Sequence, residues 1–141
     1  MEANHILIVE DDKEIREGVE IYLRSQGYEV FQAADGVEAM EILRSQPVDV
    51  VLLDIVMPRM DGFEVLKTMK EEETLSGIPV IMATSEKENS EERALLLGAD
   101  DFINKPYRAM VVKKRVENIV VKHILERKRL ENALFETRNE L

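Results

Sequence analysis

The chain has 141 residues, 45% of them hydrophobic, which suits one globular domain with an appendage. It contains no cysteine, which excludes a disulfide framework and a thiolate metal site. The net charge of −10 is uneven: residues 1–106 hold ten Lys and Arg against 24 Asp and Glu, whereas residues 107–141 hold nine against five. The acidic first part argues against nucleic-acid binding by the globular domain.

Membrane insertion and secretion are also disfavoured by the sequence. No apolar segment approaches the roughly 18 residues that a helix needs to cross a bilayer. The start, Met1 to Asn4, leads straight into a strand-like run and lacks the pattern of a signal peptide. We therefore expect a soluble, cytoplasmic protein.

Strand-like and helical patterns alternate along the chain. The segments with the apolar or β-branched character of strands are 5–9, 28–34, 50–53, 78–83 and 101–103. Helical patterns follow each of them, the first between Asp12 as its cap and Gly27 as its end, the others at 36–46, 63–72, 89–97 and about 108–141. The helix faces expected to point inward are Ile15, Val19, Tyr22 and Leu23; Val37, Met40 and Leu43; Phe63, Leu66 and Met69; and Val111, Val112 and Val116.

This alternation predicts an α/β fold: a doubly wound, five-stranded parallel sheet with helices on both faces and an extended last helix. The run at 50–53 is apolar throughout, as in a central strand that is buried on both faces, and it stops at a carboxylate, Asp54. Ligands of such folds bind beyond the carboxyl ends of the strands. Asp54 is therefore expected at the functional edge of the sheet.

Other polar side chains follow the remaining strands. Glu10 and Asp11 come after the first strand, Thr84 after the fourth and Lys105 after the fifth. In a parallel sheet they converge with Asp54 on one edge. Carboxylates that lie together repel unless a cation neutralises them, and oxygen ligands without Cys or His suit Mg²⁺ or Mn²⁺. The set is suited to phosphoryl transfer, with Asp54 as nucleophile, Lys105 neutralising charge and Thr84 donating a hydrogen bond.

Each of these residues also has a plainer interpretation. Acidic residues at strand ends are commonly helix caps or turn formers, and Asp12 and Asp61 fit that description. Thr84 alone is more often a turn residue, and Lys105 alone a solvated charge. The joint occurrence of these five residues, distributed after four different strands, favours a functional site.

The same segments carry a family resemblance. The sequence resembles a receiver domain of a two-component response regulator, with the CheY-like, flavodoxin-like fold. The resemblance covers residues 5 to about 121 and implies a receiver domain at 4–121 followed by an extension of the last helix at 122–141. The matching segments are ILIVEDD (6–12), DGVEAM (35–40), VVLLDIVMPRMDG (50–62), PVIMATS (79–85) and GADDFINKPY (98–107).

The resemblance implies a role for each matching residue. Asp54 corresponds to the phosphoacceptor, Lys105 to the phosphate-binding lysine and Thr84 to the switch hydroxyl. Phe102 corresponds to the switch aromatic, although a fixed core residue is the alternative. The peptide bond between Lys105 and Pro106 is expected to be cis. The implied metal ligands are Glu10 (through a bound water), Asp11, Asp54 and the backbone carbonyl of Val56.

The implied function is a phosphorylation-dependent switch. Asp54 would take a phosphoryl group from a sensor histidine kinase or phosphotransfer protein with Mg²⁺ (or Mn²⁺), and the chain would catalyse only its own phosphorylation and dephosphorylation. A small Mg²⁺-dependent phosphatase is the alternative, but such enzymes typically carry an acid two residues after the nucleophile, where this chain has Val56. An inactive interaction module is disfavoured by the intact residue set, and a nucleotide-binding domain by the lack of a Gly-rich loop.

The tail has its own pattern. One helix from Arg108 to Leu141 would span about 50 Å, longer than the domain is wide. Three interpretations compete: a dimeric signalling helix leading to an output domain outside this chain, the C-terminus of a stand-alone receiver that self-associates, and, least favoured, a basic surface for nucleic acid or membrane. A heptad can be written through Val116, Val120, His123, Arg127, Leu130, Leu134, Thr137 and Leu141.

Overall fold

The computed structural model describes residues 4–85 and 90–140, with the side chains of 138–140 left out. The predicted alternation is confirmed. The strands are β1 (His5–Val9), β2 (Glu29–Ala33), β3 (Val50–Asp54), β4 (Val80–Thr84) and β5 (Asp101–Asn104). The helices are α1 (Lys13–Ser25), α2 (Gly36–Ser45), α3 (Gly62–Glu71), α4 (Ser90–Leu96) and α5 (Ala109–Glu140). The tail residue Leu141, which ends the predicted heptad, and Asn89, where the fourth helix was expected to begin, lie outside the described residues.

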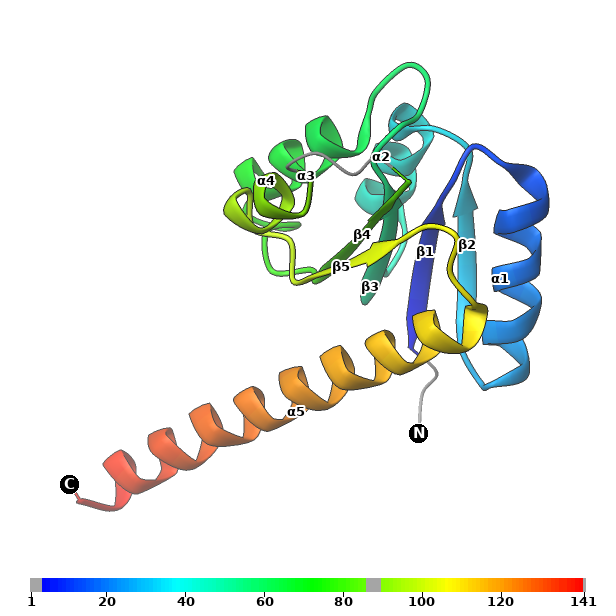
Figure 1. Cartoon of the computed structure of the whole chain (residues 1–141). Helices are drawn as coiled ribbons and strands as arrows, with labels where there is room; N and C mark the ends of the chain where they lie inside the picture. Colours follow the sequence, from blue (N-terminus) through cyan, green and yellow to red (C-terminus); the bar gives the residue numbers. More distant parts are fainter. Residues whose placement is uncertain (1–3, 86–89, 141) are drawn as a thin grey trace.

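All five strands are parallel and lie in the order β2-β1-β3-β4-β5 (Figure 1). Side chains of successive strand residues point to opposite faces, so β1 sends Ile6 and Ile8 to one side and Leu7 and Val9 to the other. Helices α1 and α5 cover the first side, and α2, α3 and α4 cover the second. The doubly wound α/β prediction is therefore confirmed.

Three predicted core positions are wrong. Ile15, Val37 and Val111 are 38%, 37% and 38% exposed. Each lies in the first turn of its helix, and Ile15 and Val37 precede the first buried apolar side chains of α1 and α2, which are Val19 and Ala39. In α5 the next residue, Val112, is already buried, so Val111 lies on the other side of that helix. The spacing of apolar residues identifies a helix face, but it does not show where along the helix the core begins.

Helix caps hold the starts of α1 and α3 in place. As predicted, the Asp12 carboxylate caps α1, accepting from the N–H groups of Glu14 and Ile15. The Asp61 carboxylate likewise caps α3 through the N–H of Glu64. Such a cap typically contributes about 1 kcal/mol to stability. Both helices therefore begin at fixed points next to the ends of β1 and β3.

The start of α3 is pressed directly against the end of β3. A Cβ atom added to Gly62 would lie 2.3 Å from the backbone oxygen of Asp54 and 2.8 Å from the Cα of Ile55. A second close approach joins α2 to the same loop, since a Cβ on Gly36 would lie 2.2 Å from the backbone oxygen of Met60. The loop after Asp54 is thus enclosed by two backbone contacts that only glycine permits.

Helix α5 packs on the sheet through its first turns and then leaves the globule (Figure 1). Val112, Val116 and Ile119 are buried, whereas Leu130 and Leu134 are 65% and 63% exposed. At about 1.5 Å per residue, the 32-residue helix is about 48 Å long. Within the described parts of the chain, no helix combines the length and apolar character needed to cross a membrane.

The contact at Gly62 can be tested by substitution. We expect Gly62→Ala to lower the free energy of unfolding by about 1–3 kcal/mol, because the methyl group must displace backbone atoms of β3. Gly18→Ala, inside α1 with no atom within 4 Å of the added Cβ, should instead raise it by about 0.5–1 kcal/mol. Urea unfolding of both variants measures this, and a neutral or stabilising Gly62→Ala would contradict it.

Candidate functional site

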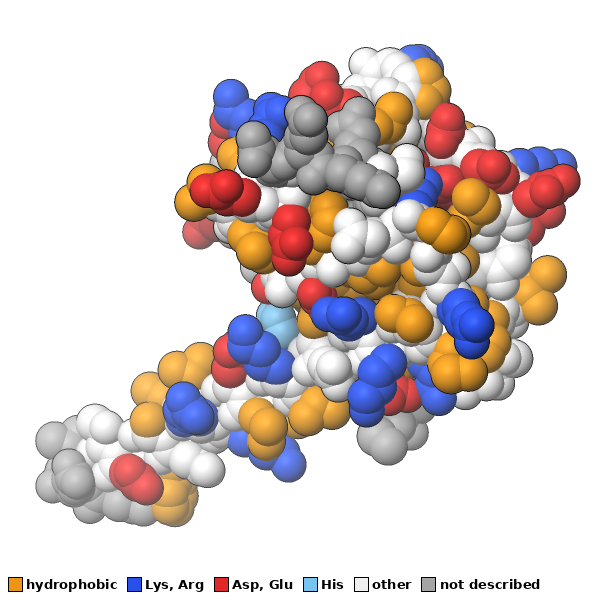
Figure 2. Space-filling view, viewed as in Figure 1, with side chains coloured by type: hydrophobic (Ala, Val, Ile, Leu, Met, Phe, Trp, Pro, Cys, Tyr) orange, Lys and Arg blue, Asp and Glu red, His pale blue; other side chains and the backbone are white. Residues whose placement is uncertain are grey.

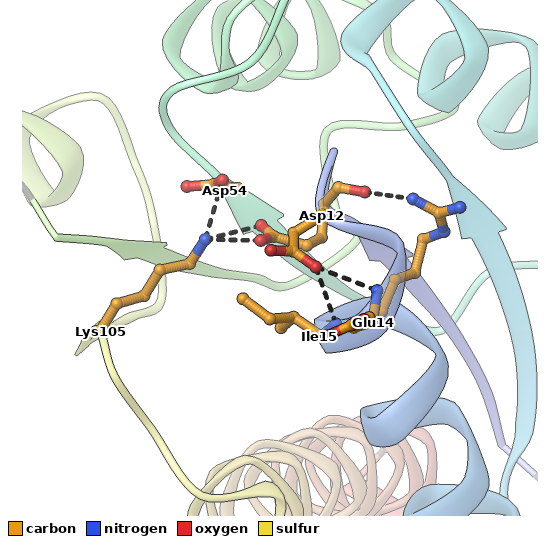
Figure 3. A network of polar contacts seen from close by, with 7 residues as sticks. Asp12, Glu14, Ile15, Asp54 and Lys105 are labelled. Atoms are coloured by element: carbon orange, nitrogen blue, oxygen red, sulfur yellow. Dashed lines mark hydrogen bonds and ion pairs between the residues drawn. The ribbon is translucent and has the colours of Figure 1, made fainter.

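The polar residues at the strand ends meet at the carboxyl edge of the sheet (Figure 3). Lys105, from the loop after β5, donates from Nζ to both carboxylate oxygens of Glu10, at 2.8 and 2.7 Å. The same nitrogen donates to Oδ2 of Asp54 at 2.9 Å. One ammonium group therefore joins the ends of β1 and β3 to the loop after β5. The predicted convergence of these residues is confirmed, and their chemical roles stay predictions.

Three carboxylates gather beside this lysine. Oxygen atoms of Glu10, Asp11 and Asp54 all lie within 4.8 Å of one another. Glu10 and Asp54 are 2% and 5% exposed, whereas Asp11 faces solvent. A set of carboxylate oxygens with one open side suits a hard cation such as Mg²⁺. Val56, the fourth predicted ligand, lies in the loop between β3 and α3 with an exposed side chain.

The electrostatics of the site reflect this crowding. Burial and the neighbouring Asp54 carboxylate raise the pKa of Glu10 to about 7, although Lys105 acts in the opposite direction. Burial of Lys105 disfavours its charge, but the hydrogen bonds to Glu10 and Asp54 outweigh this and raise the pKa of Lys105. Lys105 therefore stays charged, and an added cation would further favour the ionised form of Glu10.

The two predicted switch residues lie on neighbouring strands. Thr84 is buried at the end of β4, and its strand pairs with β3 next to Asp54. Phe102 on β5 is 9% exposed and packs in the core on the side of the sheet that α2, α3 and α4 cover. The structure shows one inward position of this ring, so its switch role stays a prediction.

The loop after β5 carries two more predicted features. The peptide bond between Lys105 and Pro106 is cis, as predicted. Ile15, which was expected in the core, instead lines an apolar recess of about 230 Å³ with Ser85, Lys105, Pro106 and Tyr107. Burial raises the pKa of the Tyr107 hydroxyl, and the Glu10 and Asp54 carboxylates raise it further. A mainly apolar recess that also includes the charged Lys105 therefore lies directly beside the acidic cluster.

Arginine contacts around the site were missed by the sequence analysis. Arg59, in the loop after β3, adopts the left-handed conformation with φ of 67° and pairs with the Asp35 carboxylate at 2.7 Å. Arg16 on α1 donates to the backbone oxygen of Glu10 at 2.7 Å. The sequence offers one signal for this contact. Arg16 follows the cap Asp12 by four residues, about one helical turn, so it lies on the same face of α1 as the end of β1.

Comparison with known proteins agrees with this geometry. The family model of the response regulator receiver domain matches residues 6–117. Response regulator GtcR of Aneurinibacillus migulanus is 37% identical over 113 residues, which cover 79% of this chain and 46% of that protein. Response regulator RR06 of Streptococcus pneumoniae is 35% identical over 117 residues, which cover 82% and 52%. The chain spans about half the length of these curated relatives.

Solved structures share the fold along nearly their whole length. Chemotaxis response regulator CheY4 of Vibrio cholerae matches with a TM-score of 0.78 and 30% identity over 83% of this chain and 98% of that one. The signal receiver domain of a histidine kinase from Syntrophus aciditrophicus matches with a TM-score of 0.79 and 34% identity over 85% and 92%. By sequence, by fold and by its acidic edge, the chain belongs to the response regulator receiver domain family.

Proposed function

We propose that the protein is a phosphorylation-dependent switch whose phosphoacceptor is Asp54. The observation that carries the proposal is the shared ammonium group of Lys105, which lies within hydrogen-bond distance of Asp54 and Glu10. It supplies positive charge beside the one buried aspartate that ends a central strand. An incoming phosphoryl group brings negative charge to this point, where Lys105 can bind it.

The carboxylates fit a divalent cation, which we propose is Mg²⁺. Asp11, Asp54 and the Val56 carbonyl would hold it, with Glu10 bonded through water. When bound, the cation would neutralise charge on the phosphoryl oxygens. An oxygen of Asp54 attacks the phosphorus of the donor, the bond from phosphorus to the histidine ring nitrogen breaks, and the ring nitrogen keeps the electron pair. Asp54 then carries an acyl phosphate.

The output of this reaction is a change of surface and not a released product. Thr84 would donate a hydrogen bond to the phosphoryl group, and movement of Phe102 would follow. We therefore propose no enzymatic activity beyond the phosphorylation and dephosphorylation of the chain itself. The phosphatase alternative is disfavoured because Val56, at the position where such an enzyme has its acid, presents an exposed apolar side chain.

The partners follow from the family. A sensor histidine kinase or a phosphotransfer protein would supply the phosphoryl group. The chain matches only about half of GtcR and RR06, so we propose that a receiver of this kind can be joined to further domains in the same protein. The matching structure from Syntrophus aciditrophicus is the receiver domain of a histidine kinase. Receiver domains therefore occur in different kinds of protein, and the proposed chemistry at Asp54 does not specify the output.

Phosphorylation can be tested with a small phosphodonor. Incubation with acetyl phosphate and Mg²⁺ should add one HPO₃ group, seen by mass spectrometry as an alkali-labile adduct. Asp54→Asn, or removal of the metal with a chelator, should abolish it. Asp61→Asn is the matched control, because asparagine still caps α3 and the carboxylate lies outside the cluster. An adduct that survives in Asp54→Asn would rule out the assignment.

We also propose that the extension of α5 self-associates. The heptad stripe is covered by the domain at Val116 and is exposed at Leu130 and Leu134. An isolated helix this polar is marginal in water, so a partner helix is expected to cover the exposed stripe. A second copy of the chain carries the same stripe and can supply that helix.

Sedimentation velocity tests this association. The full chain should sediment as a dimer, whereas a chain ending at Val121 and the variant Leu134→Glu should sediment as monomers. Ile21→Glu is the matched control: Ile21 is also apolar and 71% exposed, but it lies on α1, so the dimer should persist. A monomeric full chain at about 100 μM would remove the basis for the association.

A further inference from the structure

Arg16 links helix α1 to two strands at the acidic edge of the sheet. Its Nη1 donates to the backbone oxygen of Glu10 at 2.7 Å, and its Nε donates to Oε1 of Gln32 at 2.6 Å. Gln32 lies on β2, which pairs with β1. The close-up in Figure 3 draws this hydrogen bond as a dashed line between a guanidinium group and a backbone oxygen. The planar guanidinium has donors in fixed directions, so it fixes both acceptors relative to each other.

The carbonyl that Arg16 holds belongs to the peptide group between Glu10 and Asp11. That group is planar, so its orientation sets the direction in which Asp11 leaves β1. The N–H of Glu10 donates to the backbone oxygen of Ala33 at 3.0 Å. Both backbone polar groups of Glu10 are therefore tied to β2, one directly and the other through Arg16 and Gln32.

Asp11 depends on this arrangement more than its neighbours do. The side chain of Glu10 is held by Lys105, and that of Asp12 caps α1. Asp11 faces solvent, and its carboxylate makes no hydrogen bond to any residue that the structure describes. Its direction toward Asp54 is thus set by the backbone on either side of it.

We propose that Arg16 is a positioning residue for the cation site, holding the peptide plane that aims the Asp11 carboxylate at Asp54. Arg16 touches neither the cation nor the phosphoryl group in this role. The inference rests on the proposed Mg²⁺-dependent phosphorylation of Asp54 and adds a residue to it. Groups that orient a metal ligand in this way typically change metal affinity by 10–100-fold when they are removed.

Charge alone predicts the opposite effect. A guanidinium close to the cluster repels a divalent cation, so loss of its charge should tighten Mg²⁺ binding. Loss of a positioning contact should weaken Mg²⁺ binding. The sign of the change in affinity therefore separates the two roles.

Helix α1 also provides a matched control. Arg24 donates from Nη2 to the backbone oxygen of Val30 at 2.9 Å, so it too ties α1 to β2. It lies in the last turn of α1, at the opposite edge of the sheet from the acidic cluster. A merely structural tether between α1 and β2 should give the same result at Arg16 and at Arg24.

The experiment is calorimetric titration of Mg²⁺ into the full chain, together with urea unfolding of each variant. Arg16→Ala should weaken Mg²⁺ binding by about tenfold. Arg16→Lys should restore part of the affinity, because the ammonium can reach the Glu10 carbonyl. Arg24→Ala should bind Mg²⁺ as the wild type does, even where its stability falls. Arg16→Ala should also need about tenfold more Mg²⁺ for half-maximal adduct formation with acetyl phosphate, and reach the same level at saturation.

Each other outcome overturns a defined part of the argument. Unchanged or tighter Mg²⁺ binding by Arg16→Ala, or an equal loss in Arg24→Ala, refutes the positioning role. Should Arg16→Ala not fold, Gln32→Ala keeps the guanidinium but removes its anchor, and an unchanged affinity in that variant refutes the role as well. If the wild type binds no Mg²⁺ and forms no adduct, the proposed function itself fails, and the role of Arg16 fails with it.

Discussion

The structure depends on the ammonium group of Lys105, which is shared between two buried carboxylates. Glu10 and Asp54 come from neighbouring strands and would repel each other at this distance without a positive charge between them. Lys105 supplies that charge from a loop 95 residues after Glu10 in the sequence. Its three hydrogen bonds connect the first strand, the central strand and the last loop. The contacts that form the candidate site are therefore also the contacts that hold these two strands and the last loop together.

The surroundings of this triad explain how it can stay in place. Each functional side chain lies at a strand end, and helices packed at close range fix the connection that follows. Gly62 lets α3 start against the carbonyl of Asp54, and Gly36 lets α2 rest on Met60. Arg59 ties the same loop to Asp35 at the cap of α2. The loop that carries Val56 is thus held from both sides, as the proposed role of the Val56 carbonyl as a metal ligand would require.

Much of this arrangement could be predicted from the sequence, for a physical reason. Apolar runs identified β3 and β4, and the parallel topology alone brings Glu10, Asp54 and Lys105 to one edge. The pattern could not show that Ile15 and Val37 precede the buried part of their helices, because spacing along a helix carries no information about where the core begins. The bond from Arg16 to Glu10 was also out of reach, since it depends on how α1 lies across β1 and β2.

The length of α5 has a mechanical consequence. The helix begins three residues after Pro106, beside the acidic cluster, and continues as one hydrogen-bonded element to Glu140. Ile119, the last buried residue among the α5 side chains that the structure describes, lies about 30 Å from the far end at about 1.5 Å per residue. A tilt of about 10° around that point moves the tip by about 5 Å, roughly one helical turn. A change in packing near Tyr107 that tilts the helix would therefore be amplified with distance, as at the end of a lever.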